Sequence, residues 1–360
     1  MTRYRAIPPL LEFALFPTAP LQKVLSHTGV LPFRRRLLAF IVGAIAASGA
    51  CAGDSAALTL EATLSLGDVR GRIDHLAIDI KRQRLYVAEL GNNSIGVVDL
   101  KKAKVLRTIV GMREPQGIGY AAATDEVYVS NGGDGSVQRL QGETLAPAGT
   151  LQLSDDADNI RLDPAGRHVV IGYGTGALAI IDVAQRTQIA DIRLRGHPES
   201  FQFAPDGQQV FVNVPDAHEI ALVDLASGRQ RAAWPTGALA ANFPMALNPS
   251  GRELWVVFRH PSRLVQFDAT TGAQKQAVET CGDSDDVFAD AQRQRLYVIC
   301  GSGQIDIWQQ RGGKLSRLAQ IATRPGARTG LYVPQLDRLF VAAPVSKAMP
   351  AALLVFRPQL

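Results

Sequence analysis

The sequence lacks the short motifs that carry the most recognisable catalytic and cofactor chemistry. It contains no Gly-x-Ser-x-Gly nucleophile elbow, no His-Glu-x-x-His zinc motif, no Cys-x-x-Cys-His haem attachment and no phosphate-binding P-loop. A glycine-rich run at residues 172–176 lies in an expected hairpin and opens no helix, so it fails as a nucleotide loop. Residues 155–158 lack the glycine and the terminal glutamate of an EF-hand. No reaction is therefore assigned by motif, and an enzyme is the less favoured interpretation.

The chain also lacks an apolar run long enough to cross a bilayer comfortably. The apolar run at residues 37–47 is shorter than the roughly 20 residues that a spanning helix needs. It follows Arg34, Arg35 and Arg36 and precedes small residues up to Ala52, which is the order found in a secretory signal peptide. The arginine pair also fits a twin-arginine export signal loosely. We expect residues 1–52 to be a leader, with residues 1–29 fitting a misassigned start, and the protein to be exported to the periplasm or cell envelope.

A basic field over the domain is missing as well, although the chain has a pI near 9.2 and a formal net charge of +5. Six basic residues and one acid fall within residues 1–52, which accounts for the whole excess. The remainder, from Gly53 onward, is formally neutral and has no global field that would hold a polyanion. We therefore expect no nucleic-acid partner.

Cysteine is scarce, with three in 360 residues. Cys281 lies just before one expected strand and Cys300 ends the strand that pairs with it, so a disulfide in an oxidising compartment and two buried thiols are both open. Cys51 follows Gly49 and Ala50, as in a lipoprotein signal, but Ser48 fits that signal poorly. Cleavage after Ala52 is the favoured alternative to a lipid anchor at Cys51.

What the sequence does contain is a repeat with a period of 41 to 44 residues. Its centre is a hydrophobic triplet of strand-forming residues, present seven times, with central residues Tyr86, Tyr128, Val170, Phe211, Trp255, Tyr297 and Phe340. A period of about 40–45 residues with strand-like cores is typical of β-propeller blades. The repeat predicts an all-β fold, a seven-bladed β-propeller of four-stranded antiparallel blades, as a single domain over residues 53–360.

The ends of the array predict how the ring closes. In the first repeat, strands are expected at residues 76–80, 85–89, 95–100 and 105–110, joined by Gly- and Asn-rich turns. The seventh repeat ends at residues 353–357, one strand short, whereas residues 58–66 form a strand-like segment without a partner. We expect this N-terminal strand to complete the last blade, because closure removes the exposed sheet edges.

The Tyr-Val-type repeat resembles that of the YVTN-type (YncE-like) bacterial propeller proteins. The similarity covers about residues 58–357 and extends to longer strings that resemble an exported subgroup of the family: residues 72–77, 114–117, 131–135, 155–159, 196–200, 241–246 and 326–329. The resemblance implies a propeller fold and an export route. It implies no common biochemical activity.

When the repeats are aligned on the triplet, one position at the start of each innermost strand carries residue types that the fold does not require. We call the residues at this position the column. Twelve residues before the centre lie Asp74, Gln116, Asp158, Glu199, Phe243, Asp285 and Arg328. The next position holds His75, Gly117, Asn159, Ser200, Pro244, Asp286 and Thr329. We expect these residues to ring one mouth of the central channel, where propellers commonly bind ligands. The candidate ligand-binding set is Asp74, His75, Gln116, Asp158, Asn159, His197, Glu199, Asp285, Asp286 and Arg328.

Several interpretations of this ring stay open. Asp74, Asp158, Glu199 and Asp285 form an oxygen-rich set suited to a divalent cation such as calcium, whereas His75 and His197 favour a transition metal. The favoured structural interpretation is that the acids cap turns, with Arg328 neutralising both Asp285 and Asp74.

Other basic groups near this mouth also have two interpretations. His75 beside Asp74 is either a general base or a hydrogen-bonded channel residue. Arg259, His260 and Arg263 form either an anion site or a solvated turn, the latter slightly favoured.

Three functions follow from these features. The first is an exported propeller that binds a small ligand or an envelope protein at the channel mouth without catalysis. The second, by fold analogy with calcium-dependent lactonase propellers, is a metal-dependent hydrolase or lactonase in which His75 or an acid activates water. The third is a scaffold for envelope assembly.

Overall fold

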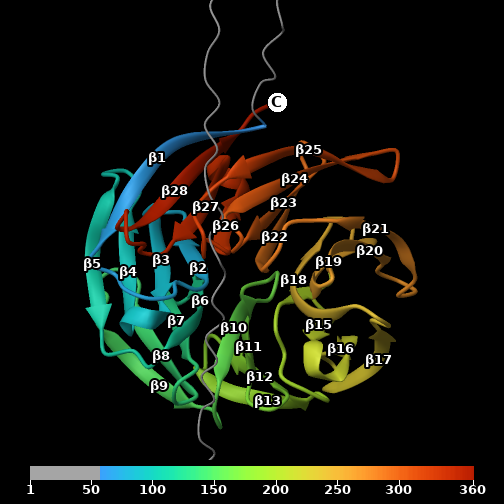
Figure 1. Cartoon of the computed structure of the whole chain (residues 1–360). Coiled ribbons are helices and arrows are strands. Elements are labelled where there is room, and N and C mark those ends of the chain that lie inside the picture. The colour runs from blue at the N-terminus through green and yellow to red at the C-terminus, as the bar shows by residue number, and fades with distance from the viewer. Residues whose placement is uncertain (1–56) are drawn as a thin grey trace, which may run out of the picture. The chain divides into compact units, whose positions relative to one another are not determined.

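The computed structural model describes residues 57–360, and the expected leader and Cys51 lie outside them. The described chain forms seven four-stranded antiparallel sheets arranged in a ring, and its innermost strands face the central channel (Figure 1). The only other regular elements in this part of the chain are three 3₁₀ turns of three residues each, η1 (Leu90–Asn92), η2 (Pro215–Ala217) and η3 (Pro334–Leu336). The predicted seven-bladed β-propeller is confirmed.

The blades follow one another in chain order, and each runs from the channel outward. Blade 1 comprises β2 (Leu76–Asp79), β3 (Arg84–Glu89), β4 (Ser94–Asp99) and β5 (Lys104–Val110). Blade 2 comprises β6 (Pro115–Ala121), β7 (Glu126–Asn131), β8 (Ser136–Gln141) and β9 (Pro147–Gln152). Blade 3 comprises β10 (Ala157–Leu162), β11 (His168–Tyr173), β12 (Ala177–Asp182) and β13 (Thr187–Arg193). Blade 4 comprises β14 (Phe201–Phe203), β15 (Gln209–Val214), β16 (Glu219–Asp224) and β17 (Arg229–Pro235). Blade 5 comprises β18 (Ala240–Leu247), β19 (Glu253–His260), β20 (Ser262–Asp268) and β21 (Gln274–Glu279). Blade 6 comprises β22 (Ser284–Asp290), β23 (Arg295–Cys300), β24 (Gln304–Arg311) and β25 (Lys314–Ala322).

Blade 7 is built from both ends of the described chain. It comprises β26 (Thr329–Val333), β27 (Arg338–Ala343), β28 (Ala351–Pro358) and, as its outermost strand, β1 (Leu58–Gly67). β1 pairs antiparallel with β28, and Leu58 lies opposite Pro358. The two strands lie side by side in Figure 1. The expected closure by the N-terminal strand is therefore confirmed.

The repeated triplet forms the buried second strand of each blade. Tyr86, Tyr128 and Tyr297 are fully buried because both faces of these strands pack against neighbouring blades. The outer strands are more exposed, as in β17, where partly buried residues alternate with exposed ones. Seven hydrophobic clusters fill the spaces between blades, so the core is a ring of inter-blade contacts rather than one centre.

A buried ion-pair network joins neighbouring blades at the face where each first strand turns into the second. Arg293 of blade 6 contacts Asp290 at 3.1 Å and donates to both oxygens of Asp337 in blade 7, at 2.9 Å each. The same arrangement recurs two blades further around the ring, where Arg82 of blade 1 contacts Asp79 of its own blade and Asp125 of blade 2. Sequence analysis did not identify this network, although its members lie at matching places in the repeat.

Candidate functional site

Seven residues from seven blades surround one polar cavity at the channel mouth. The cavity has a volume of about 170 Å³, and the seven are the complete first column of the repeat: Asp74, Gln116, Asp158, Glu199, Phe243, Asp285 and Arg328. Its other lining residues are Arg72, His75, Asp156, His197 and Arg259. Phe243 is the single non-polar side chain in this lining. The cavity therefore suits a small polar or charged ligand rather than an apolar one.

Irregular strand pairing places these side chains at the mouth. Four inner strands have a break in register at the column: between Pro115 and Ile118, Ala157 and Ile160, Asn242 and Met245, and Ser284 and Asp286. Gln116, Asp158, Phe243 and Asp285 lie within these breaks. A bulge releases a residue from the regular ladder and re-aims its side chain, and bulges are frequent beside functional sites.

Arginines neutralise two of the four acids of the column. Arg72 donates to Asp74 at 2.6 Å, and Arg259 donates to Asp285 at 2.6 Å while its guanidinium stacks 3.9 Å above the Phe243 ring. The expectation for Arg328 was wrong: its Nη2 lies 2.8 Å from Asp283 Oδ2 instead of pairing with Asp285 and Asp74. The reason is local, since nearer arginines already occupy those two acids.

His75 lines the cavity and lies against two predicted ligand residues that do not line it. Its Nε2 is 2.9 Å from Asn159 Nδ2, and its Nδ1 is 3.8 Å from Asp286 Oδ2. Both partners are buried, and Asp286 also accepts a hydrogen bond from the backbone N–H of Gly330. Asn159 and Asp286 therefore contact His75 from outside the cavity lining, whereas the sequence placed them among the residues at the mouth. With both ring nitrogens facing protein groups, His75 is poorly placed as a general base.

The charge state of His75 also explains an unsatisfied buried atom. Burial would lower the pKa of His75, but Asp286 and Asp74 outweigh it and raise the pKa to about 9. A protonated ring donates from both nitrogens, so it requires an acceptor at Nε2. Asn159 Oδ1, which is buried without a partner, becomes that acceptor if the amide is rotated by half a turn.

The stability of the protein should consequently fall as the pH rises from about 6.5 to 9. In the unfolded chain His75 loses its proton near its ordinary pKa of about 6.5, whereas the folded protein holds it to about 9. The stabilisation is thus complete below pH 6.5 and is lost as the pH passes 9. The groups facing the ring are Asp74, Asp286 and Arg161. Urea unfolding across this range should show the decline in the native protein and a smaller one in His75→Gln; equal slopes would contradict the assignment.

Asp158, His197 and Glu199 form a third cluster, which no arginine neutralises. One donor atom from each lies within 4.8 Å of the others, and His197 Nε2 is 3.5 Å from Asp158 Oδ2. Burial raises the pKa of Glu199 to about 8, and the nearby carboxylates of Asp158 and Asp285 act in the same direction. Burial would lower the pKa of His197, but Asp158 and the carbonyl of Gly174 raise it to about 9. The cluster therefore favours additional positive charge.

Four lining residues fall outside the candidate ligand-binding set: Arg72, Asp156, Phe243 and Arg259. Phe243 belongs to the column, and Arg259 was considered separately, as part of an anion site or a solvated turn. Arg72 and Asp156 each lie two residues before a column residue, and His197 has the same position relative to Glu199. Residues two apart in an extended chain point to the same side, so a second column shifted by two would have found Arg72 and Asp156. Arg259 lies four residues after its repeat centre, where the other blades carry Leu90, Gly132, Gly174, Pro215, Gly301 and Pro344. It is the single charged residue at this position of the repeat.

Cys281 and Cys300 are joined in a disulfide beside this mouth, with a Cα–Cα distance of 5.9 Å. The bond links the segment before β22 to the end of β23. That segment leads directly to Asp283 and Asp285, the partners of Arg328 and Arg259. The disulfide thus constrains the loop whose Asp283 and Asp285 bind Arg328 and Arg259, two of the three arginines that line the cavity.

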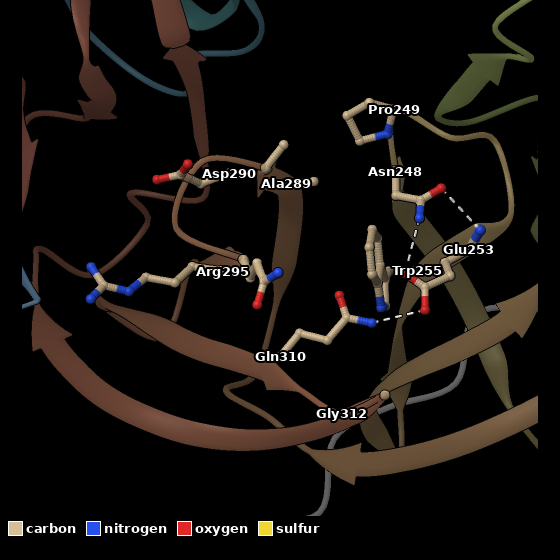
Figure 2. Close-up of a pocket in the computed structure, with 12 residues that line it drawn as sticks. Asn248, Pro249, Glu253, Trp255, Ala289, Asp290, Arg295, Gln310 and Gly312 are labelled. Carbon is tan, nitrogen blue, oxygen red and sulfur yellow. Dashed lines mark hydrogen bonds between the residues drawn. The ribbon is translucent and has the colours of Figure 1, made fainter. Parts of the chain in front are cut away.

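A second cavity, of about 320 Å³, lies at the opposite ends of inner strands β18 and β22, between blades 5 and 6 (Figure 2). Glu253 accepts hydrogen bonds from the side chains of Asn248 and Gln310 within it. The guanidinium of Arg295 points away from the other labelled side chains (Figure 2) and binds the Gln359 carbonyl. Asn248, Glu253 and Gln310 pair with one another, and Asp290 and Arg295 bind groups outside the lining, so few polar groups remain for a ligand and this cavity is the weaker candidate.

Comparison with known proteins supports the fold. The structure is similar to Kuenenia stuttgartiensis hydrazine synthase, with a TM-score of 0.70 and 15% identity over 81% of this chain and 96% of that one. It is also similar to a chain in a crystal structure of the mitotic checkpoint complex, with a TM-score of 0.71 and 16% identity over 90% of this chain and 99% of that one. No protein-family model matches the sequence, and no curated protein is significantly similar to it. At these identities the likeness shows a β-propeller of the kind that WD40-like proteins share, and nothing about activity.

Among residues 57–360, no helix is long and apolar enough to cross a membrane.

Proposed function

We propose that this chain is an exported YVTN-type propeller that binds a small anion-bearing ligand in the cavity at its channel mouth. The observation that carries the proposal is the convergence of the seven column residues, one from each blade, on one polar cavity. The fold supports a binding role because propellers offer the channel mouth as a preformed concave site. Export is supported by the arginine-led leader sequence and fits the Cys281–Cys300 disulfide, since such bonds persist in oxidising compartments.

The distribution of charge around the ring favours an anionic group on the ligand. The three arginines of the lining come from blades 5, 7 and 1, and each contacts an acid: Arg259 with Asp285, Arg328 with Asp283 and Arg72 with Asp74. The acids that no arginine contacts, Asp156, Asp158 and Glu199, come from blades 3 and 4. Arg72 is the most open of the arginines, with 48% of its side chain exposed. A planar guanidinium binds carboxylate or phosphate groups with two hydrogen bonds, so the arginine side is the expected anchor.

Binding without catalysis agrees better with the geometry than hydrolysis does. The hydrolase alternative assigned the role of base to His75 or to an acid, and His75 is turned toward Asn159 and Asp286, which leaves only an acid for that role. We therefore propose a small-molecule ligand and assign no reaction to the site. An envelope-assembly scaffold gains no support from the cavity, which is too small for a protein segment of any length.

Titration calorimetry with inorganic phosphate, succinate and glutamate tests the proposal. We expect at least one of these probes to bind the native protein, and Arg328→Gln to weaken that binding about tenfold or more, since a charged hydrogen bond of roughly 1.5–3 kcal/mol is lost. Arg107→Gln, on exposed strand β5, is the matched control and should bind normally. No binding by any probe, or equal binding by both variants, would refute the proposed ligand class.

A further inference from the structure

The imidazole of His197 is held in the orientation of a metal ligand. Its Nδ1 donates to the carbonyl oxygen of Gly174 at 2.6 Å, which directs Nε2 toward Asp158, in the cluster that also contains Glu199. Ligating histidines commonly donate their second nitrogen to a carbonyl or carboxylate, and this contact fixes the tautomer and the ring orientation. Gly174 lies in the β11–β12 hairpin of blade 3, so the orienting contact comes from outside the cluster itself.

The two carboxylates that face this nitrogen are available, unlike the other acids of the ring. Asp158 makes no ion pair with an arginine within the described chain, and the side chain of Glu199 makes neither a hydrogen bond nor an ion pair there. Asp74 and Asp285, by contrast, are each held by an arginine at 2.6 Å. A divalent cation would displace the protons held by Glu199 and His197, and it would then balance the charge of −2 on two carboxylates and a neutral imidazole.

We propose that Asp158, His197 and Glu199 bind a divalent transition metal of the zinc type at the channel mouth. The distance of 3.5 Å between Asp158 Oδ2 and His197 Nε2 is close to the roughly 3.4 Å that separates two ligands of tetrahedral zinc. Only the Glu199 carboxylate needs to move inward. Three protein ligands beside an open cavity leave coordination positions for a ligand or water.

The donor set favours this class of metal over calcium. Calcium takes about six to eight oxygen ligands, and the cluster offers two free carboxylates and one nitrogen. Imidazole nitrogen with carboxylate oxygen suits zinc and its neighbours in the first transition row. The earlier four-acid calcium set, Asp74, Asp158, Glu199 and Asp285, is thus divided by the arginines into two paired acids and two free ones.

This inference deepens the proposed function, because the metal lies on the acidic side of the same cavity and leaves the arginine side for the anion. It is tested with metal alone, so the two ideas can fail separately. Metal retention without binding of phosphate, succinate or glutamate would refute the proposed ligand and leave the metal site standing. Binding of a probe by protein that retains no metal would refute the metal site and leave the proposed ligand standing.

The experiment is equilibrium dialysis of the purified protein against Zn²⁺, Mn²⁺ and Ca²⁺ separately, with bound metal measured by mass spectrometry. We expect about one Zn²⁺ per chain, and a loss of affinity of at least about tenfold in Glu199→Gln and in His197→Gln. Glu143→Gln is the matched control, since this exposed glutamate lies outside the cavity lining, and it should keep the native zinc affinity. Asp285→Asn tests the alternative four-acid calcium set.

Circular dichroism of each variant verifies that it is folded, and two independent ligand variants guard against the failure of one. Three results would overturn the proposal: no metal retained by native protein, equal zinc affinity in folded Glu199→Gln and His197→Gln, or calcium bound in preference to zinc and lost in Asp285→Asn.

Discussion

Replacing Leu66 by aspartate should destabilise the folded ring by about 4 kcal/mol or more, most of the margin of a typical domain. Leu66 lies on closing strand β1 with 2% of its surface exposed, in the cluster that joins blade 7 to blade 1. The substitution removes roughly 2–3 kcal/mol of apolar burial and places a carboxylate where no partner exists for it. Blade 7 then loses its outer strand, which exposes the edge of β28.

The same substitution six residues earlier is the natural control. Leu60 lies on the same strand with 51% of its surface exposed, so Leu60→Asp should change the unfolding free energy by no more than about 0.5 kcal/mol. Urea unfolding and size-exclusion chromatography of both variants measure the difference. If both variants unfold at the native midpoint, β1 does not close the ring in solution.

Repetition explains how much of this molecule is predictable from its sequence. The period located the second strand of every blade, and through the missing strand it located the closure between β1 and β28. It also predicted the seven column residues, because equivalent positions in a closed ring face the same channel. The second strands, the closure between β1 and β28 and the column follow from position in the repeat alone.

The unpredicted features depend instead on which partner a long side chain selects. Arg328 reaches Asp283 rather than the two acids of the column, and Asn159 and Asp286 contact His75 from outside the lining. An arginine can reach several acids at a channel mouth, and only the three-dimensional distances decide between them. The division of the acids into paired and free groups follows from those distances.

Replacing Arg293 by methionine should lower the unfolding free energy by about 3 kcal/mol. The side chain of Arg293 is 7% exposed and joins Asp290 to Asp337 across the blade 6–7 interface, and its Nε donates to the Gln359 carbonyl at 3.2 Å. Methionine fills the space but leaves Asp290, which is 1% exposed, as a buried and largely unpaired charge. Breaking a buried pair from one side costs about 3–5 kcal/mol, and we take the lower limit because Asp337 is partly exposed.

A second substitution separates lost charge pairing from lost packing. In the Arg293→Met background, Asp290→Asn should recover part of the stability, because a neutral amide is less costly to bury and can still accept the hydrogen bond from Tyr297. Thermal and urea unfolding of the single and double variants provide the measurement. Arg107→Met, on the exposed face of β5, should be close to neutral. An unchanged midpoint in Arg293→Met would show that the network contributes nothing measurable.

The pairing of β1 with β28 sets the order in which the ring can form. Residues 58 and 358 meet in one ladder although the whole domain separates them in sequence. Each of the first six blades is local in the chain, so it can pair its strands as soon as its own roughly 40 residues are available. The seventh blade cannot be completed until its last strand has been synthesised, although its outer strand emerged first. β1 therefore has no strand partner until every other blade has been synthesised. The last strand pairing that can form, between β1 and β28, involves the first strand of the ring.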